Sequence, residues 1–132
     1  MKILAVDYGS ARTGVAISDP TGTIARPLGV VEGAASEDGL ERLARLVRDE
    51  EAERVVVGLP LTLRGERGEQ ARETDAFVEA LRAAIDVPVE SYDERFTTGL
   101  AATVGSGDTP EDARAAAHLL SSYLAWSSSE QK

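Results

Sequence analysis

The chain has 132 residues, 42% of them hydrophobic, with a formal net charge of −9. This composition fits one folded domain with a real core. No apolar run reaches the roughly 20 residues that cross a bilayer, and the N-terminus lacks a signal-peptide core, so we expect a cytoplasmic protein. Zero cysteines and one histidine exclude disulfides and thiolate or multi-histidine metal sites. Catalysis would therefore rest on carboxylates, hydroxyls, Arg or Lys. The negative charge argues against a broad basic face but leaves a local basic strip open.

Three short segments near the start of the chain predict neighbouring antiparallel strands. Residues 2–6 are apolar and partly β-branched, residues 13–18 follow after a turn, and residues 24–31 follow a second turn at 19–22. Pro27 marks the third strand as an edge strand, because proline cannot donate to a sheet ladder.

The remainder of the chain alternates between helix and strand patterns. In order, we expect a helix capped by Ser36, a strand at 54–59, a loop at 60–68, a helix with Ala71, Phe77, Val78 and Leu81 on its apolar stripe, a strand at 87–92, a short helix at 96–104, and a helix from Thr109-Pro110 to about Trp126. This order predicts an α/β fold with a mixed five-stranded sheet flanked by helices. The first three strands are antiparallel and the last two are parallel to the first. We expect a single domain over residues 1–126 and a polar tail at 127–132.

Acidic residues directly follow two of the predicted strands. Asp7 closes the first strand, and Asp93 and Glu94 close the fifth, either of which could face a site. Sites in open α/β sheets gather at the carboxyl ends of strands, and these two ends share an edge if strand four lies between them. Asp112, in the first turn of the last helix, is a third candidate. Converging carboxylates repel each other unless a cation joins them, and oxygen ligands favour Mg²⁺ or Mn²⁺.

Ordinary structural roles compete with this interpretation. An Asp after a strand often only starts a turn, which is the alternative for Asp7. The sequence Thr109-Pro110-Glu111-Asp112 resembles a capping box, in which Asp112 would serve the helix end. Asp112 also falls on the apolar stripe of the helix, in line with Ala116 and Tyr123. A carboxylate on that face is costly unless something there needs it, which favours a site.

Four sequence blocks resemble a known family. Residues 7–16, Asp-Tyr-Gly-Ser-Ala-Arg-Thr-Gly-Val-Ala, resemble the DxGxxRxGxA signature of the YqgF/RuvX family of Holliday junction resolvases related to RuvC. Residues 57–60, Val-Gly-Leu-Pro, are similar to its second block. Residues 93–98, Asp-Glu-Arg-Phe-Thr-Thr, are similar to its DER[LF][ST][ST] block, and the stretch from Asp112 to Leu124 to its C-terminal block.

The resemblance implies an RNase H-like fold and a metal-dependent nuclease. The family is associated with maturation of the 5′ end of 16S rRNA and, through its relation to RuvC, with branched DNA. Its acidic set would be Asp7, Glu94 and Asp112, holding Mg²⁺ or Mn²⁺, with Thr97 and Thr98 at the rim of the site. One block departs from the family: many members carry an Asn-Met-Asp-Gly-like stretch where residues 61–65 here read Leu-Thr-Leu-Arg-Gly.

Several arginines belong to segments that leave the same predicted sheet edge. They are Arg12, Arg64, Arg67 and Arg95. Guanidinium forks suit phosphate oxygens, so we expect these residues to contact nucleic acid. The alternative for Arg67 is pairing with neighbouring glutamates.

Three residues of the last helix carry ring side chains. We expect His118 at the side of the helix rather than on a metal. Tyr123 and Trp126 are expected to pack, although base stacking stays open for them.

The leading hypothesis is a Mg²⁺- or Mn²⁺-dependent endonuclease acting on structured RNA or DNA. The rival is a module that binds rRNA or branched DNA without cutting it, although a pure phosphate binder gains nothing from three carboxylates. The run Asp7-Tyr8-Gly9 followed by Gly14 also resembles the phosphate loop of actin-like kinases, but those folds need two lobes and a longer chain. Monomer and homodimer both remain open.

Overall fold

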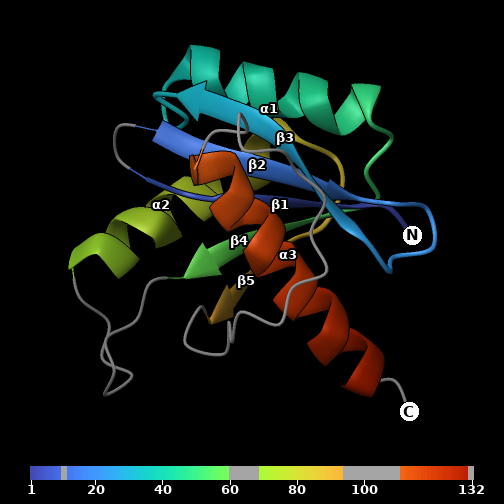
Figure 1. Ribbon diagram of the computed structural model, residues 1–132. Coiled ribbons are helices and arrows are strands. Elements are labelled where there is room, and N and C mark those ends of the chain that lie inside the picture. The colour runs from blue at the N-terminus through green and yellow to red at the C-terminus, as the bar shows by residue number, and fades with distance from the viewer. Residues whose placement is uncertain (10–11, 60–68, 94–110, 131–132) are drawn as a thin grey trace.

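The computed structural model describes residues 1–9, 12–59, 69–93 and 111–130. Five strands form one mixed sheet at its centre (Figure 1): β1 Ile3–Asp7, β2 Arg12–Ser18, β3 Ala25–Glu32, β4 Arg54–Leu59 and β5 Val89–Asp93. The order is β3-β2-β1-β4-β5, with β1, β4 and β5 parallel and the two hairpin pairings antiparallel. The predicted mixed sheet is therefore confirmed. Because β4 lies between β1 and β5, the carboxyl ends of these three strands share one edge.

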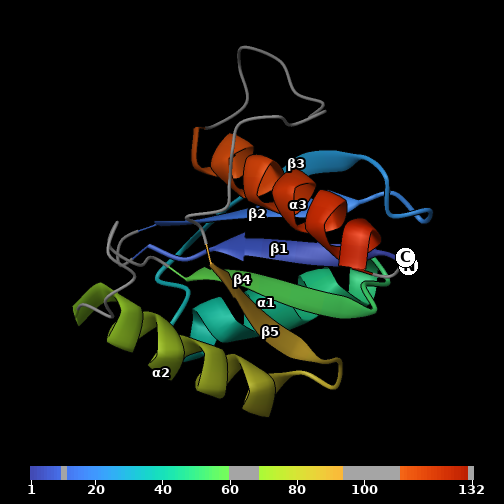
Figure 2. The ribbon, with the colours of Figure 1, turned by 90° about the horizontal axis from the view of Figure 1, so that it is seen from below.

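Three helices cover the two faces of the sheet (Figure 2). Helices α1 (Glu37–Asp49) and α2 (Glu69–Ala84) lie on one face, and α3 (Glu111–Glu130) lies on the other. The core is split accordingly, with Leu4 and Val6 of β1 in the cluster toward α1 and α2. The intervening β1 residues, Ile3 and Ala5, pack with α3 instead, as the alternation of a strand requires. No helix in the described part of the chain is long and apolar enough to cross a membrane.

The first helix begins and ends in recognisable cap structures. The hydroxyl of Ser36 accepts a hydrogen bond from the N–H of Gly39 at 3.0 Å, so the predicted N-cap is confirmed. At the other end, Glu51 N–H donates to the carbonyl of Arg48 and Ala52 N–H to that of Val47, which is a Schellman motif. Glu51 takes the left-handed conformation of this motif, with φ of 56°.

Pro27 lies on the edge strand β3, as its sequence suggested. The register between β2 and β3 shifts between Val15 and Ala16, which pair with Gly29 and Pro27. Leu28 is therefore the extra residue of a bulge beside the proline. A bulge on an edge strand accommodates a residue that has no N–H to donate.

A polar network ties α3 to two strands of the sheet. The hydroxyl of Tyr123 donates to the carboxylate of Glu90 on β5 and accepts from Arg54 Nη1 on β4 at 3.1 Å. Arg54 and Glu90 also form an ion pair at 3.7 Å. Burial and the hydrogen bond to Glu90 raise the pKa of Tyr123, so its phenol stays protonated as the donor.

Predicted and observed element boundaries differ mainly at the end of the chain. Helix α3 continues to Glu130, so it extends past the expected end near Trp126 and includes most of the predicted polar tail. No Gly or Pro follows Trp126, and an established helix elongates readily. The loop predicted at 60–68 and the short helix predicted at 96–104 lie outside the described residues.

Candidate active site

Asp7 ends the central strand β1 at the shared carboxyl edge of the sheet. Asp7 is half-buried. Since Ile3 and Ala5 face α3, the two-residue period of the strand directs the Asp7 side chain to the same face. The carboxylate therefore lies on the side of the sheet covered by α3.

Gly14 brings the first turn of α3 against this position. Asp7 and Gly14 are cross-strand partners between β1 and β2. A Cβ atom built on Gly14 would lie 1.8 Å from the backbone oxygen of Asp112 and 2.4 Å from its carbonyl carbon. Only a glycine permits so close an approach of helix and strand backbones. Because Gly14 lies beside Asp7 and beneath Asp112, the two acidic residues meet at one edge of the sheet.

Arg12 lies beside the second of these carboxylates. Its Nε is 3.4 Å from Asp112 Oδ2, and the side chains of Arg12 and Asp112 are 67% and 39% exposed. Ion pairs this exposed contribute little to stability, so neither group is committed to the pair. Arg12 and Asp112 thus lie side by side at the carboxylate edge, and both are accessible to a ligand.

Hydrogen bonds join Gly9, just after β1, to Thr13 on β2. The buried hydroxyl of Thr13 accepts from Gly9 N–H and donates to Gly9 O, both at 3.3 Å. A Cβ on Gly9 would lie 2.4 Å from the carbonyl oxygen of Arg12, so this position requires glycine. Sequence analysis placed a turn here but did not single out Thr13 or the contact of Gly14. The glycines of the DxGxxRxGxA block were the signal that could have revealed both constraints.

Comparison with known proteins identifies the family to which this chain belongs. A family model for RuvX, described as Holliday junction resolvase, matches residues 1–126. The chain belongs to the RuvX family. The first three predicted blocks and the C-terminal block lie inside the match, so the resemblance read from the sequence is confirmed.

RuvX relatives from two bacteria carry the same name, "Putative pre-16S rRNA nuclease". The protein of Chloroflexus aurantiacus is 48% identical over 96 residues, which cover 73% of this chain but only 63% of that protein. The protein of Desulforamulus reducens is 36% identical over 132 residues, covering 94% of this chain and 96% of that protein.

Solved structures confirm the RuvX fold as RuvC-like. RuvC of Thermus thermophilus in complex with a Holliday junction substrate aligns with a TM-score of 0.68, covering 98% of this chain and 96% of that chain. A second structure of RuvC from the same organism has a TM-score of 0.58. The sequence identities are 15% and 18%, so this likeness speaks for the fold alone.

Most of the other predicted RuvX site residues cannot be placed. Glu94, Arg64, Arg67, Arg95, Thr97 and Thr98 lie outside the described residues. The backbone of Asp93 is described: it ends β5 as the partner of Leu59, at the same edge as Asp7. Among the residues that the structure describes, no group of three or more His, Cys, Asp or Glu could hold a metal. The described part of the chain thus places the backbones of Asp7 and Asp112, two of the three predicted acidic residues, near each other through Gly14.

The ring side chains of α3 have different surroundings. His118 is half-buried at the side of the helix, as expected. Tyr123 is only 1% exposed, which confirms its predicted packing role, but Trp126 is 47% exposed. Trp126 is therefore not simply the packing residue expected from the sequence, and base stacking stays open for it.

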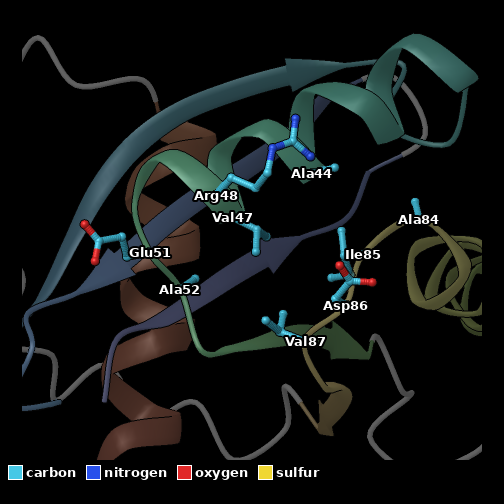
Figure 3. Close-up of a pocket in the computed structure, with 9 residues that line it drawn as sticks. All are labelled: Ala44, Val47, Arg48, Glu51, Ala52, Ala84, Ile85, Asp86 and Val87. Carbon is cyan, nitrogen blue, oxygen red and sulfur yellow. The ribbon is translucent and has the colours of Figure 1, made fainter.

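A separate pocket lies at the opposite edge of the sheet (Figure 3). It has a volume of about 310 Å³ and lies between the end of α1 and the segment that joins α2 to β5. Its walls are mainly apolar and include Val47, Ala52, Ile85 and Val87, with Arg48, Glu51 and Asp86 also lining it. Because it lies at the amino ends of β4 and β5, it takes no part in the chemistry of the carboxylate edge.

Proposed function

We propose that this protein is a divalent-metal-dependent nuclease that hydrolyses phosphodiester bonds in structured nucleic acid in the cytoplasm. The observation that carries the proposal is the contact of Gly14, the cross-strand partner of Asp7, with the backbone of Asp112 at the carboxyl edge. Two carboxylates kept together on one face of a sheet need a cation to offset their repulsion. The membership in a family described as Holliday junction resolvase supports phosphodiester cleavage as the use of that cation.

The donor set fits a hard metal ion. Asp7 and Asp112 offer carboxylate oxygens, and Glu94 is the proposed third ligand, taken from the family's acidic block. Oxygen donors without a thiolate or imidazole suit Mg²⁺ or Mn²⁺. When bound, such an ion supplies a polarised water and charge stabilisation at the scissile phosphate.

The cationic and hydroxyl side chains would position the phosphate. Arg12 is largely exposed and lies against Asp112, so a phosphate oxygen at the site can take its guanidinium as a partner. Because Thr13, the residue after Arg12, is hydrogen-bonded to Gly9 just after β1, the start of β2 is held near the carboxylates, and little entropy is lost in placing this cation. We assign the same contact role to Arg64, Arg67 and Arg95, and a role at the rim of the site to Thr97 and Thr98.

The proposed substrate is the 5′ end of precursor 16S rRNA. The names of the relatives from Chloroflexus aurantiacus and Desulforamulus reducens support RNA. The family description supports the second candidate, a Holliday junction. The carboxylate edge itself suits a phosphodiester of either nucleic acid, so both substrates belong in the test.

The deciding experiment compares cleavage of a precursor 16S rRNA fragment and a four-way DNA junction with Mn²⁺. Asp7→Asn keeps the size of the side chain but removes a charged ligand, so we expect cleavage to fall at least about a hundredfold. Asp86→Asn, an exposed acid at the opposite edge, is the matched control and should cut normally. Full activity in Asp7→Asn would reject the mechanism. Metal-dependent binding of either substrate without cleavage would instead favour a non-cleaving binding module.

A further inference from the structure

The outward side of α3 differs in charge from the rest of the protein. The chain carries 23 acidic residues against 14 Lys and Arg. Yet α3 has no acidic residue from Ala113 to Ser129, the longest such stretch in the sequence. Its outward residues are neutral or basic and include Arg114, Ala115, Ser122, Ala125 and Trp126. We call this set the outer face of α3.

One cation of this face, Arg114, is available to a ligand. Arg114 is exposed and forms no ion pair or hydrogen bond with any part of the chain that the structure describes. Near the other end of the face, the charge of Glu90 on β5 is already met by Arg54 and by the hydroxyl of Tyr123. The next acidic residue along α3 is Glu130, four positions after Trp126. In a chain of net charge −9, this face is where a polyanion can approach with little repulsion.

Trp126 presents an aromatic surface at the C-terminal end of the face. Its ring is backed by Tyr92 at 5.7 Å and by Tyr123 at 5.8 Å, and those two rings contact each other edge to face at 5.5 Å. A hydrogen bond of 2.9 Å between Tyr92 and Ser122 ties this cluster to α3. The indole is thus held from behind and is still 47% exposed. A fixed, exposed ring is a platform on which an unpaired base can stack.

The face leads away from the carboxylate edge. Asp112 and Trp126 are 14 residues apart on one continuous helix, which is about 21 Å at 1.5 Å per residue. They lie on the same flank, because four turns of helix return close to the starting direction. Figure 2 shows α3 running across its face of the sheet, away from the sheet edge at which β1 ends.

We propose that the outer face of α3, from Arg114 to Trp126, binds an unpaired RNA strand that continues from the scissile phosphate, with one base stacked on Trp126. This rests on the proposed nuclease function and adds a second contact region to it. A strand of about four nucleotides, at the lower end of single-strand site sizes, is enough to occupy the face. Charge complementarity favours RNA over a second copy of this acidic chain as the occupant.

The only tryptophan in the chain gives a direct measurement, because intrinsic tryptophan fluorescence reports on Trp126 alone. The probe is a 12-nucleotide single-stranded RNA, added to the full chain in EDTA so that no cleavage occurs. We expect saturable quenching. The duplex of the same sequence should quench far less, because its bases are already paired and stacked. Trp126→Ala, measured by anisotropy of labelled RNA, should weaken binding about tenfold, and Trp126→Phe should retain most of the affinity.

Arg114→Ala tests the charged end of the same face. It should weaken binding and lower the slope of log affinity against log salt by about 1. The matched control is Arg42→Ala, an exposed arginine on α1 at the other face of the sheet, which should bind as the wild type does.

Three results would overturn the proposal. They are unchanged Trp126 emission on RNA binding, equal losses in Arg114→Ala and Arg42→Ala, and a concentration-dependent dimer in which Trp126 is buried without RNA. Its failure can be told apart from failure of the proposed function. If RNA quenches Trp126 but the protein never cleaves a substrate, the docking face is supported and the nuclease function is rejected. If the protein cleaves RNA but the emission of Trp126 does not change, only the docking face is rejected.

Discussion

Gly14 shows how one residue without a side chain can position two with carboxylates. Its missing Cβ lets the Asp112 backbone lie against β2, beside Asp7. Gly14→Ala must push the first turn of α3 outward, since the obstacle is backbone. Overpacking of this kind costs about 1–3 kcal/mol, and we expect a loss of that size in the free energy of unfolding measured in urea. We also expect cleavage to fall by more than the fraction unfolded explains.

Gly29→Ala on β3 is the matched control for this substitution. A Cβ at Gly29 would meet nothing within 4 Å, so the free energy of unfolding should change by less than about 0.5 kcal/mol. Equal losses in the two variants would show that Gly14 serves only as a flexible residue of the strand.

Glu51 is the one described residue other than glycine with a positive φ, 56°. It occupies the position after the α1 C-cap that glycine usually takes, because a Cβ is strained there by about 1 kcal/mol. Glu51→Gly should therefore raise the free energy of unfolding by about that amount and the Tm by about 4 °C. Glu51→Ala keeps the Cβ and should bring no such gain. A similar gain in both variants would point to the lost charge rather than to the backbone.

The sequence identified individual candidate site residues but not the contacts between them. Asp7 was found from its position after a strand, and Asp112 from its place on an apolar stripe whose other members, Ala116 and Tyr123, are buried. The closeness of Asp7 and Asp112 depends on a glycine contact between segments about 100 residues apart, and no local pattern encodes such a contact.

Among the elements, the β2–β3 turn is held by one carboxylate. Asp19 accepts from the hydroxyl of Thr21 and from the N–H groups of Thr23 and Ile24, at 2.8 and 2.9 Å. These bonds, the Thr21 hydroxyl first, hold the pKa of Asp19 well below its ordinary value of 3.8. A carboxylate with a lowered pKa stabilises the fold above its unfolded pKa, near 4, and that contribution fades as the pH falls further.

The prediction concerns the difference in unfolding free energy between the wild type and Asp19→Ala. It should be constant from pH 7 to pH 5 and should shrink below about pH 4, as followed by urea unfolding. Thr21→Val removes the main donor and should weaken this pH dependence, yet it should change little when added to Asp19→Ala. A difference that stays constant down to pH 2.5 would contradict the role of the turn.

Helices and strands were predicted correctly where a local sequence pattern determines them. The fourth strand was predicted with its observed bounds, Arg54–Leu59, because its short apolar run is rich in β-branched valine and is followed by Pro60. The end of α3 was predicted too early, because serines were taken as the end of a helix that tertiary contacts had already nucleated. The bulge of β3 beside Pro27 could not be read from the sequence, since it depends on the register with β2.

For the whole molecule, strand order was predictable because three hairpin-like segments followed by helix-linked strands allow few topologies. The complete site could not be built, because Glu94, Arg64, Arg67 and Arg95 lie outside the described residues. Two carboxylates and one arginine therefore carry the structural case for the active site, and the family carries the rest.

Binding of a metal ion should stabilise the whole chain against unfolding. In a chain of net charge −9, we expect a divalent cation to bind at the edge of the sheet where Asp7 and Asp112 lie. Mn²⁺ at about 100 times its Kd should raise the free energy of unfolding by about 2.7 kcal/mol, seen as a higher Tm at constant ionic strength. Asp7→Asn should lose this gain. Asp86→Asn, with the same change in net charge, should keep the gain. If Asp7→Asn gained as much from Mn²⁺ as Asp86→Asn does, the ion would be bound elsewhere on this acidic surface, and Asp7 would be only the residue that ends β1.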